Sequence, residues 1–389
     1  MKNYRMLTLT LGAVCALSAV AGGGFTLSGT LPGVNDSVKV VLVNAERDKA
    51  QKIAEVVTTD GTFTLADSVK MPTLCKLNIQ TRGKNGEFRT RTSPRLMVEN
   101  TDMKVSFLAS LDSMSNSYVS ETLIGVEGSK AQSQFKEYLD ACLSAERKAD
   151  NASYMSAKKY FESNADKDTM MKYTALKKEA AAVLLAAQKR FISEHPDYHI
   201  SSVLTFQELM RTYIYTEPEL VTMVETVKVC PDTARVGLNE RALAWSRKYS
   251  LGMAYPDFEV NDTNNDTHSF SEYVTPGKYT FIDFWASWCG PCRAAIPHVR
   301  KLYNQYAGKM NIYSISCDND DAAWRKAMDK EQMEWTQLHL NENQMGVVPQ
   351  LYLLSAIPRL LLFDPEGRIV CSTNSPDEVD EYLAKNISL

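Results

Sequence analysis

One short motif, Cys289-Gly290-Pro291-Cys292, constrains this chain more than any other feature of its sequence. Two thiols at this spacing can close a small disulfide ring and reopen it, so the pair can carry two electrons. Pro291 suits the first turn of a helix, because the N–H that proline lacks has no helical partner there. A helix that begins here places Cys289 at the positive end of the helix dipole, which favours the reactive thiolate.

The segments on either side of the motif predict a turn from a buried strand into a helix. Tyr279–Trp285 is an apolar, β-branched and aromatic run typical of a buried strand. Arg293–Tyr306 carries apolar residues at helical spacing, which predicts an amphipathic helix. The alternative, half of a zinc site, needs two further thiol or imidazole ligands, and the sequence has no second C-x-x-C. His195 and His199 flank a proline at a predicted helix end, where capping explains them better than metal ligation, so we expect no metal.

The combined motifs resemble the thioredoxin superfamily, and within it the TlpA/ResA-like thiol–disulfide oxidoreductases of bacterial envelopes, with an AhpC/TSA-type thioredoxin-like domain. The stretches that carry the resemblance are Phe281–Pro297, Tyr313–Asp318, Ala356–Arg359 and Leu361–Val370. The resemblance implies an α/β thioredoxin-like domain over residues 251–389. In that fold a central sheet is flanked by helices, and the C-x-x-C lies at a helix N-terminus.

The expected catalytic residues are Cys289, Cys292 and Asp283. Cys289 precedes the helix, should be partly exposed and is the hypothesised nucleophile; Cys292 would resolve the mixed disulfide, and the two would form the redox disulfide. Asp283 interrupts a buried apolar run, where an ionised carboxylate is costly. Desolvation would raise its pKa and suit it to accept the Cys292 proton, as its match to the buried aspartate of thioredoxin implies. The alternative is a hydrogen-bonded structural acid.

The resemblance also implies a substrate-binding surface around the dithiol. Its expected members are Trp288, Gly290, Pro291, Ile357 and Pro358. Pro358 should be cis, as in the substrate-facing loop of the fold, and would hold Ile357 so that its backbone pairs with an extended substrate strand. Trp288 should lie beside the thiol, whereas Trp285 should be core. Arg359 stands where many relatives carry Thr, which leaves the substrate preference open.

The first residues predict export from the cytosol. Basic residues precede the apolar run Met6–Val20, and Ala19-Val20-Ala21 fits the A-x-A cleavage pattern, so we expect a signal peptide over residues 1–21. The apolar run is short for a membrane span, and no other stretch is expected to cross a membrane. Lipid anchoring through Cys15 is less favoured, because a small residue should precede the cysteine. We therefore expect a protein of the periplasm or cell envelope.

Two further regions precede the redox module. Residues 22–110 show short alternating runs between turn signals, which predicts a small all-β, sandwich-like domain. Within it, Ala54–Thr58 and Thr62–Leu65 are expected to pair as a hairpin across Asp60-Gly61. Residues 129–250 show helical periodicity and are expected to form a helical domain. The β-rich region resembles one of unknown function that often precedes thioredoxin modules, and binding or scaffolding is its expected role.

The net charge of the chain and the dipeptide between the two cysteines limit the functions to be expected. The formal net charge of −4 gives no argument for nucleic-acid binding. Gly-Pro is the dipeptide of thioredoxin, whose potential is about −270 mV against about −120 mV for the oxidant DsbA. We therefore expect reduction or isomerisation of protein disulfides, with no cofactor beyond the dithiol. A reductant outside the cytosol must be recharged, which implies a membrane electron donor, and relatives act in cytochrome c maturation.

Two alternatives stay open at this point. One is a thiol peroxidase of the peroxiredoxin-related group, whose signature needs Pro and Thr upstream of the reactive cysteine; here Ala286 occupies the Thr position. The other is an envelope protein whose β and helical regions capture a partner, the redox pair being secondary.

Overall fold

The computed structural model describes residues 23–46, 51–111, 113–114, 121–162, 167–306 and 308–387. The predicted signal peptide lies outside these residues. The chain forms two compact units, the first comprising Met1–Phe191 with Tyr198–Val203 and the second Ile192–Asp197 with Leu204–Leu389. The domain boundaries expected from the sequence remain predictions.

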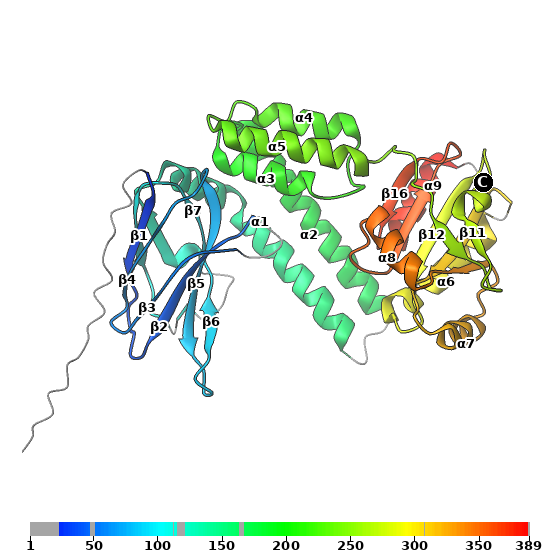
Figure 1. The fold of residues 1–389 in the computed structure, drawn as a ribbon, viewed down its shortest axis with the longest axis horizontal. Coiled ribbons are helices and arrows are strands. Elements are labelled where there is room, and N and C mark those ends of the chain that lie inside the picture. The colour runs from blue at the N-terminus through cyan, green and yellow to red at the C-terminus, as the bar shows by residue number, and fades with distance from the viewer. Residues whose placement is uncertain are drawn as a thin grey trace, which may run out of the picture. The chain divides into compact units, whose positions relative to one another are not determined.

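The first unit begins with a β-rich region of two sheets (Figure 1). One sheet has the order β4-β1-β8-β9 and the other β3-β2-β5-β6, with β7 pairing β5. The strands are β1 (Phe25–Thr30), β2 (Val38–Asn44), β3 (Gln51–Thr58), β4 (Thr62–Asp67), β5 (Thr73–Arg82), β6 (Phe88–Thr92), β7 (Arg95–Val98), β8 (Asp102–Phe107) and β9 (Ile124–Glu127). Alternate apolar residues of both sheets, such as Leu27 and Leu77, meet in one core. The expected β-rich region is therefore confirmed.

The prediction of a hairpin across Asp60-Gly61 is wrong. β3 pairs with β2 and β4 pairs with β1, so the two consecutive strands belong to different sheets. Gly61 has a φ of +83°, and its carbonyl accepts a hydrogen bond from Leu31 N at 2.9 Å. A Cβ on Gly61 would lie 2.4 Å from the Leu31 carbonyl oxygen. The glycine therefore turns the chain from one sheet to the other against the end of β1, rather than closing a two-stranded ribbon.

Helices follow the β-rich region, as the sequence predicts. They are α1 (Lys130–Phe161), α2 (Lys167–Glu194), α3 (His199–Leu209), α4 (Glu217–Val227), α5 (Thr233–Ser246) and the short 3-10 helix η2 (Arg247–Tyr249). The Ser129 side chain caps α1 by accepting from Gln132 N at 3.0 Å. In the second unit, α4 and α5 pack through a cluster that includes Leu220, Val224 and Leu243. No helix among the described residues has both the length and the apolar character of a membrane span.

The second unit contains a seven-stranded mixed sheet with helices on its faces (Figure 1). Its order is β11-β10-β14-β13-β12-β15-β16. The elements are β10 (Glu259–Asn261), β11 (Thr267–Ser269), η3 (Phe270–Tyr273), β12 (Tyr279–Trp285), α6 (Gly290–Gln305), β13 (Met310–Ser316), α7 (Asp321–Glu331), β14 (Thr336–His339), α8 (Glu342–Leu351), β15 (Arg359–Phe363), β16 (Ile369–Thr373) and α9 (Pro376–Asn386). This is the expected α/β thioredoxin-like fold.

The central strand β12 has a hydrophobic cluster on each face. Phe281 and Trp285 pack with α6 on one face, whereas Ile282 and Phe284 pack on the other with Phe270 and other aromatic residues. Because a strand buried on both faces needs apolar residues on both of them, the mainly apolar run at 279–285 is explained, and Asp283 is its one charged residue. β12 pairs with β13 in parallel and with β15 in antiparallel fashion, and so brings the ends of three strands together near the motif.

Candidate active site

The two motif cysteines lie at the turn from β12 into α6, where the sequence places them. Cys289 is the N-cap of α6, and Gly290 and Pro291 are its first two helical residues. The Cys292 backbone N–H lies 3.2 Å from Cys289 Sγ and donates to it. When the pair is reduced, this N–H and the helix dipole both stabilise negative charge on the Cys289 sulfur. The geometry thus favours Cys289 as the thiolate.

The structure holds the pair in its oxidised state. Cys289 and Cys292 form a disulfide with an S–S distance of 2.03 Å and a Cα–Cα distance of 5.3 Å. Cys292 is fully buried. The expected partial exposure of Cys289 is wrong, because its exposed fraction is 4%. The sulfur is covered in part by the loop before β15.

That loop carries the expected cis peptide bond between Ile357 and Pro358, which the structure confirms. The Ile357 carbonyl oxygen lies 3.8 Å from Cys289 Sγ. The sulfur has no proton in the disulfide, so this approach is a packing contact that leaves a backbone acceptor beside the reactive atom. Trp288 is 71% exposed next to the disulfide, while Trp285 is fully buried in the core. An exposed indole and a backbone carbonyl beside the sulfur are both suited to contact an extended chain.

Asp283 lies on the face of β12 that packs against α6. It alternates along β12 with Phe281 and Trp285, which pack in the same cluster as Cys292. Its carboxyl group is fully buried, and desolvation raises the pKa of Asp283 from 3.8 to about 7, although a hydrogen bond from Ser314 Oγ to Oδ2 at 3.2 Å opposes the rise. A carboxyl that titrates near neutrality can exchange a proton with a thiol.

Two polar residues that the sequence pattern did not single out, Ser314 and Trp335, lie next to Asp283 or one hydrogen bond away from it. Ser314 contacts Asp283, and Trp335 Nε1 donates to Ser314 Oγ at 2.8 Å. A signal was present in the strand Tyr313-Ser314-Ile315-Ser316, where serines alternate with apolar residues although the strand is buried on both faces. Two hydroxyls on one face of such a strand indicate buried acceptors opposite them.

A second buried acid, Asp318, ties the active-site turn to β13. One of its carboxylate oxygens accepts from Ser287 Oγ at 2.6 Å, and the other from Ser287 N and from Ser316 Oγ, each at 2.8 Å. Its backbone carbonyl accepts from His339 Nε2 at 3.0 Å. Ser287 lies two residues before Cys289, so Asp318 fixes the backbone that carries the sulfur.

Asp318→Ala is therefore expected to lower the free energy of unfolding by about 2–4 kcal/mol, because several charge-assisted hydrogen bonds in a buried site are lost together. All five tryptophans of the chain lie in the second unit, so tryptophan fluorescence during denaturation reports on this unit. The control is Asp321→Ala, which removes an acid whose side chain is 45% exposed and should change stability by about 0.5 kcal/mol or less. Equal effects of the two variants would contradict the anchoring role of Asp318.

The other cysteines of the second unit do not form disulfides. Cys317 is buried at the end of β13, and burial, followed by the charges of Asp318 and Asp283, raises the pKa of its thiol to about 12. Such a thiol stays protonated and unreactive near neutral pH. Within the described ranges, no group of three or more His, Cys, Asp or Glu side chains is arranged to hold a metal ion.

Arg359 follows the cis bond and is half-buried. Its Nη1 lies 3.4 Å from Ser372 Oγ, and its Nε has no hydrogen-bond partner among the described residues. Desolvation lowers the pKa of its guanidinium group. The guanidinium cation of Arg359 therefore lies beside the candidate substrate loop, and few hydrogen bonds from the protein stabilise its charge.

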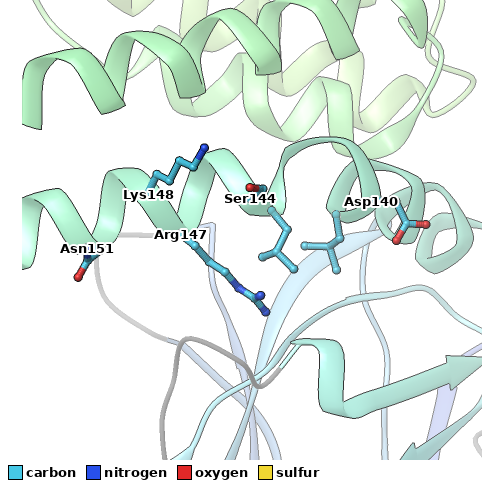
Figure 2. Close-up of a pocket in the computed structure, with 7 residues that line it drawn as sticks. Asp140, Ser144, Arg147, Lys148 and Asn151 are labelled. Atoms are coloured by element: carbon cyan, nitrogen blue, oxygen red, sulfur yellow. The ribbon is translucent and has the colours of Figure 1, made fainter. Parts of the chain in front are cut away.

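A groove of about 510 Å³ lies elsewhere, along α1 in the first unit (Figure 2). The residues that line it are Leu139, Asp140, Leu143, Ser144, Arg147, Lys148 and Asn151. Asp140 is paired with Lys136 at 2.7 Å, and the lining residues come from one helix. The groove thus offers no converging set of catalytic groups, and the chemistry of the described chain centres on the disulfide.

Comparison with known proteins finds relatives of the region that carries this site. The AhpC/TSA family profile matches residues 251–372. Over 141 residues the chain is 27% identical to the thiol-disulfide oxidoreductase ResA of Oceanobacillus iheyensis, covering 35% of this chain and 72% of that protein. ResA of Geobacillus kaustophilus is 24% identical over 138 residues, covering 34% of this chain and 76% of that protein.

Solved structures include similar domains. The thioredoxin domain of a thiol-disulfide oxidoreductase from Bacteroides vulgatus is 28% identical with a TM-score of 0.33, covering 36% of this chain and 98% of that one. A thiol-disulfide oxidoreductase from Bacteroides fragilis is 23% identical with a TM-score of 0.33, covering 35% of this chain and all of that one (100%). On the family profile and the curated relatives, the last third of this chain is an AhpC/TSA-family thioredoxin-like domain, homologous to ResA-type thiol–disulfide oxidoreductases, which implies a disulfide oxidoreductase activity.

Proposed function

We propose that this protein reduces or isomerises disulfide bonds of other proteins through the Cys289–Cys292 dithiol, outside the cytosol. The observation that carries the proposal is the disulfide at the N-terminus of α6, with the Ile357 carbonyl 3.8 Å from Cys289 Sγ. A redox-active sulfur and a backbone acceptor are thus presented together. An extended segment that carries a disulfide can pair with the loop while its sulfur meets Cys289.

The reaction starts from the reduced enzyme. The Cys289 thiolate attacks one sulfur of the substrate disulfide, forming a mixed disulfide and releasing the other substrate sulfur as a thiolate. Cys292 then attacks Cys289 Sγ, which breaks the mixed disulfide and releases the second substrate thiolate. Two electrons pass to the substrate, its two thiolates take up protons, and the enzyme is left with the disulfide seen in the structure.

Cys292 must lose its proton before it can attack. It is fully buried, and burial disfavours the thiolate. Asp283, buried on the same face of the sheet, is the proposed acceptor, because a pKa of about 7 lets it take a proton near neutral pH and later give it up. The proton moves from Cys292 Sγ to the Asp283 carboxylate as the mixed disulfide resolves.

The proposed direction is reductive. Gly290-Pro291 is the dipeptide of thioredoxin, whose potential lies about 150 mV below that of DsbA. A reductant in an oxidising compartment is consumed unless it is recharged, so the proposal includes a membrane electron donor that reduces the disulfide. It also includes export through a signal peptide over residues 1–21 and, as the family resemblance implies, a role in cytochrome c maturation.

The test is to measure the reduction potential of the full chain against redox buffers and its rate of insulin reduction. We expect a potential near about −270 mV and faster reduction of insulin than of hydrogen peroxide. A potential near about −120 mV would reverse the proposed direction. Preferential consumption of peroxide would favour the thiol peroxidase alternative.

A further inference from the structure

Three buried side chains form a hydrogen-bonded chain that ends at Asp283. Trp335 Nε1 lies 2.8 Å from Ser314 Oγ, and Ser314 Oγ lies 3.2 Å from Asp283 Oδ2. The exposed fraction is 3% for Trp335 and 0% for the other two residues. The hydrogen-bonded chain is therefore shielded from water. In such an interior, each hydrogen bond has a large effect on the free energy of a charged group.

The fold fixes all three positions. Ser314 lies directly opposite Asp283 in the parallel pairing of β12 with β13. Trp335 precedes β14 and packs in the same hydrophobic cluster as Cys292, with its ring 6.0 Å from that of Tyr303. Its backbone carbonyl accepts from Gln337 Nε2 at 3.1 Å. The Trp335 indole is therefore held in a fixed position, from which its N–H donates a hydrogen bond to Ser314 Oγ.

The chemistry of indole sets the direction of the chain. The indole nitrogen can only donate, so the Ser314 hydroxyl oxygen must accept from Trp335. The Ser314 hydrogen is then free to point away from the indole, and Asp283 Oδ2 is the acceptor within reach. A donated hydrogen bond stabilises the ionised carboxylate. The pair Trp335 and Ser314 thus opposes the effect of burial on Asp283.

The same arrangement distinguishes the two carboxylate oxygens. Oδ2 accepts from Ser314, whereas Oδ1 is buried with no hydrogen-bond partner among the described residues. A buried oxygen without a donor is the better place for a proton, because a protonated Oδ1 carries no uncompensated charge. Oδ1 is therefore the atom suited to receive the proton of Cys292.

We infer that Trp335 and Ser314 are positioning residues for the proton transfer, holding Asp283 with Oδ2 engaged and Oδ1 free, and so setting the pH range in which Cys292 can resolve the mixed disulfide. This inference rests on the proposed function, because it deepens the role given there to Asp283. It predicts that two residues remote in sequence from the motif change the pH dependence of mixed-disulfide resolution without contacting the substrate.

The test uses the full chain and measures two quantities against pH. The first is the rate of mixed-disulfide resolution, and the second is the carboxyl ¹³C chemical shift of Asp283 in the oxidised protein. Ser314→Ala should move both titrations upward by about one pH unit, because one hydrogen bond to the carboxylate is lost. Trp335→Phe should move both titrations upward by less. Ser314→Thr, which keeps the hydroxyl, should leave them at their wild-type positions.

The double variant adds a sharper criterion. Because Trp335 acts through Ser314, combining the two substitutions should shift the titrations no further than Ser314→Ala alone. The matched control is Trp324→Phe, which removes another fully buried indole of the same cluster, one whose Nε1 has no hydrogen-bond partner in the described chain. This control should leave both titrations unchanged even if it lowers stability.

The outcomes separate this inference from the proposed function. If Asp283→Asn abolishes the pH dependence of resolution but Ser314→Ala and Trp335→Phe behave like Trp324→Phe, the inference is wrong and the proposed proton transfer stands. If Asp283→Asn leaves the pH dependence unchanged, the proposed proton transfer is wrong. The carboxyl titration then still decides whether Ser314 and Trp335 control Asp283.

Discussion

Cys289→Ser is expected to lower the rate of disulfide reduction by at least about 10³-fold, because the attacking thiolate is lost and a serine hydroxyl cannot replace it near neutral pH. Cys292→Ser should behave differently. It keeps the nucleophile but cannot resolve the intermediate, so it should accumulate a covalent adduct with substrate. Insulin reduction measures the first effect, and non-reducing electrophoresis with mass spectrometry measures the second.

The matched control for both variants is Cys317→Ala. Cys317 is buried in the same unit, but burial keeps its thiol protonated near neutral pH, and it has no disulfide partner. Its removal should leave turnover close to that of the wild type. Rapid turnover by Cys292→Ser without a trapped adduct, or loss of activity in Cys317→Ala without loss of folding, would contradict the assigned roles.

Asp283→Asn should stabilise the protein at pH 8 while slowing its reaction. In the unfolded chain the carboxyl ionises near pH 3.8, but in the folded chain it ionises near pH 7. Below pH 3.8 the carboxyl group is protonated in both states and does not lower the free energy of unfolding. As the pH rises to about 7 the unfolded state is increasingly favoured, and the full cost above that pH is about 4 kcal/mol. The amide avoids this cost because it does not ionise.

The rate of mixed-disulfide resolution should fall by about 10- to 100-fold in the same variant, because general acid–base assistance is lost. Denaturation followed by tryptophan fluorescence at pH 5 and pH 8 measures the stability of the second unit, and stopped-flow reduction measures the rate. The stabilisation should be larger at pH 8. A stability difference that does not vary with pH would show that Asp283 does not titrate as the buried geometry requires.

Local sequence patterns predicted much of this site. The apolar run before the motif, the proline inside it and the helical periodicity after it together indicate a strand, a cap and a helix, all within about 30 residues. Asp283 could be singled out because a charged residue in a buried run is costly and therefore needs a reason. The cis bond at Pro358 came instead from the resemblance.

Features that depend on distant partners could not be predicted in this way. The turn at Gly61 looked like a hairpin, but its course is decided by Leu31 at the end of another strand. The burial of Cys289 depends on the loop at Ile357, far along the chain. The link from Trp335 to Ser314 joins residues 21 positions apart and requires the strand order to be known. In each case the deciding contact is not local.

The near-complete burial of Cys289, with 4% of its surface exposed, limits which disulfides can react. Exchange requires the three sulfurs to approach a straight line, so the substrate chain must bend around its own bridge to reach a recessed atom. A bridge locked inside a rigid fold cannot make that approach, whereas one in a pliable segment can. Under the proposed function we therefore expect the protein to select disulfides by the flexibility of the chain around the bond rather than by local sequence, and to react slowly with the bridges of stably folded proteins.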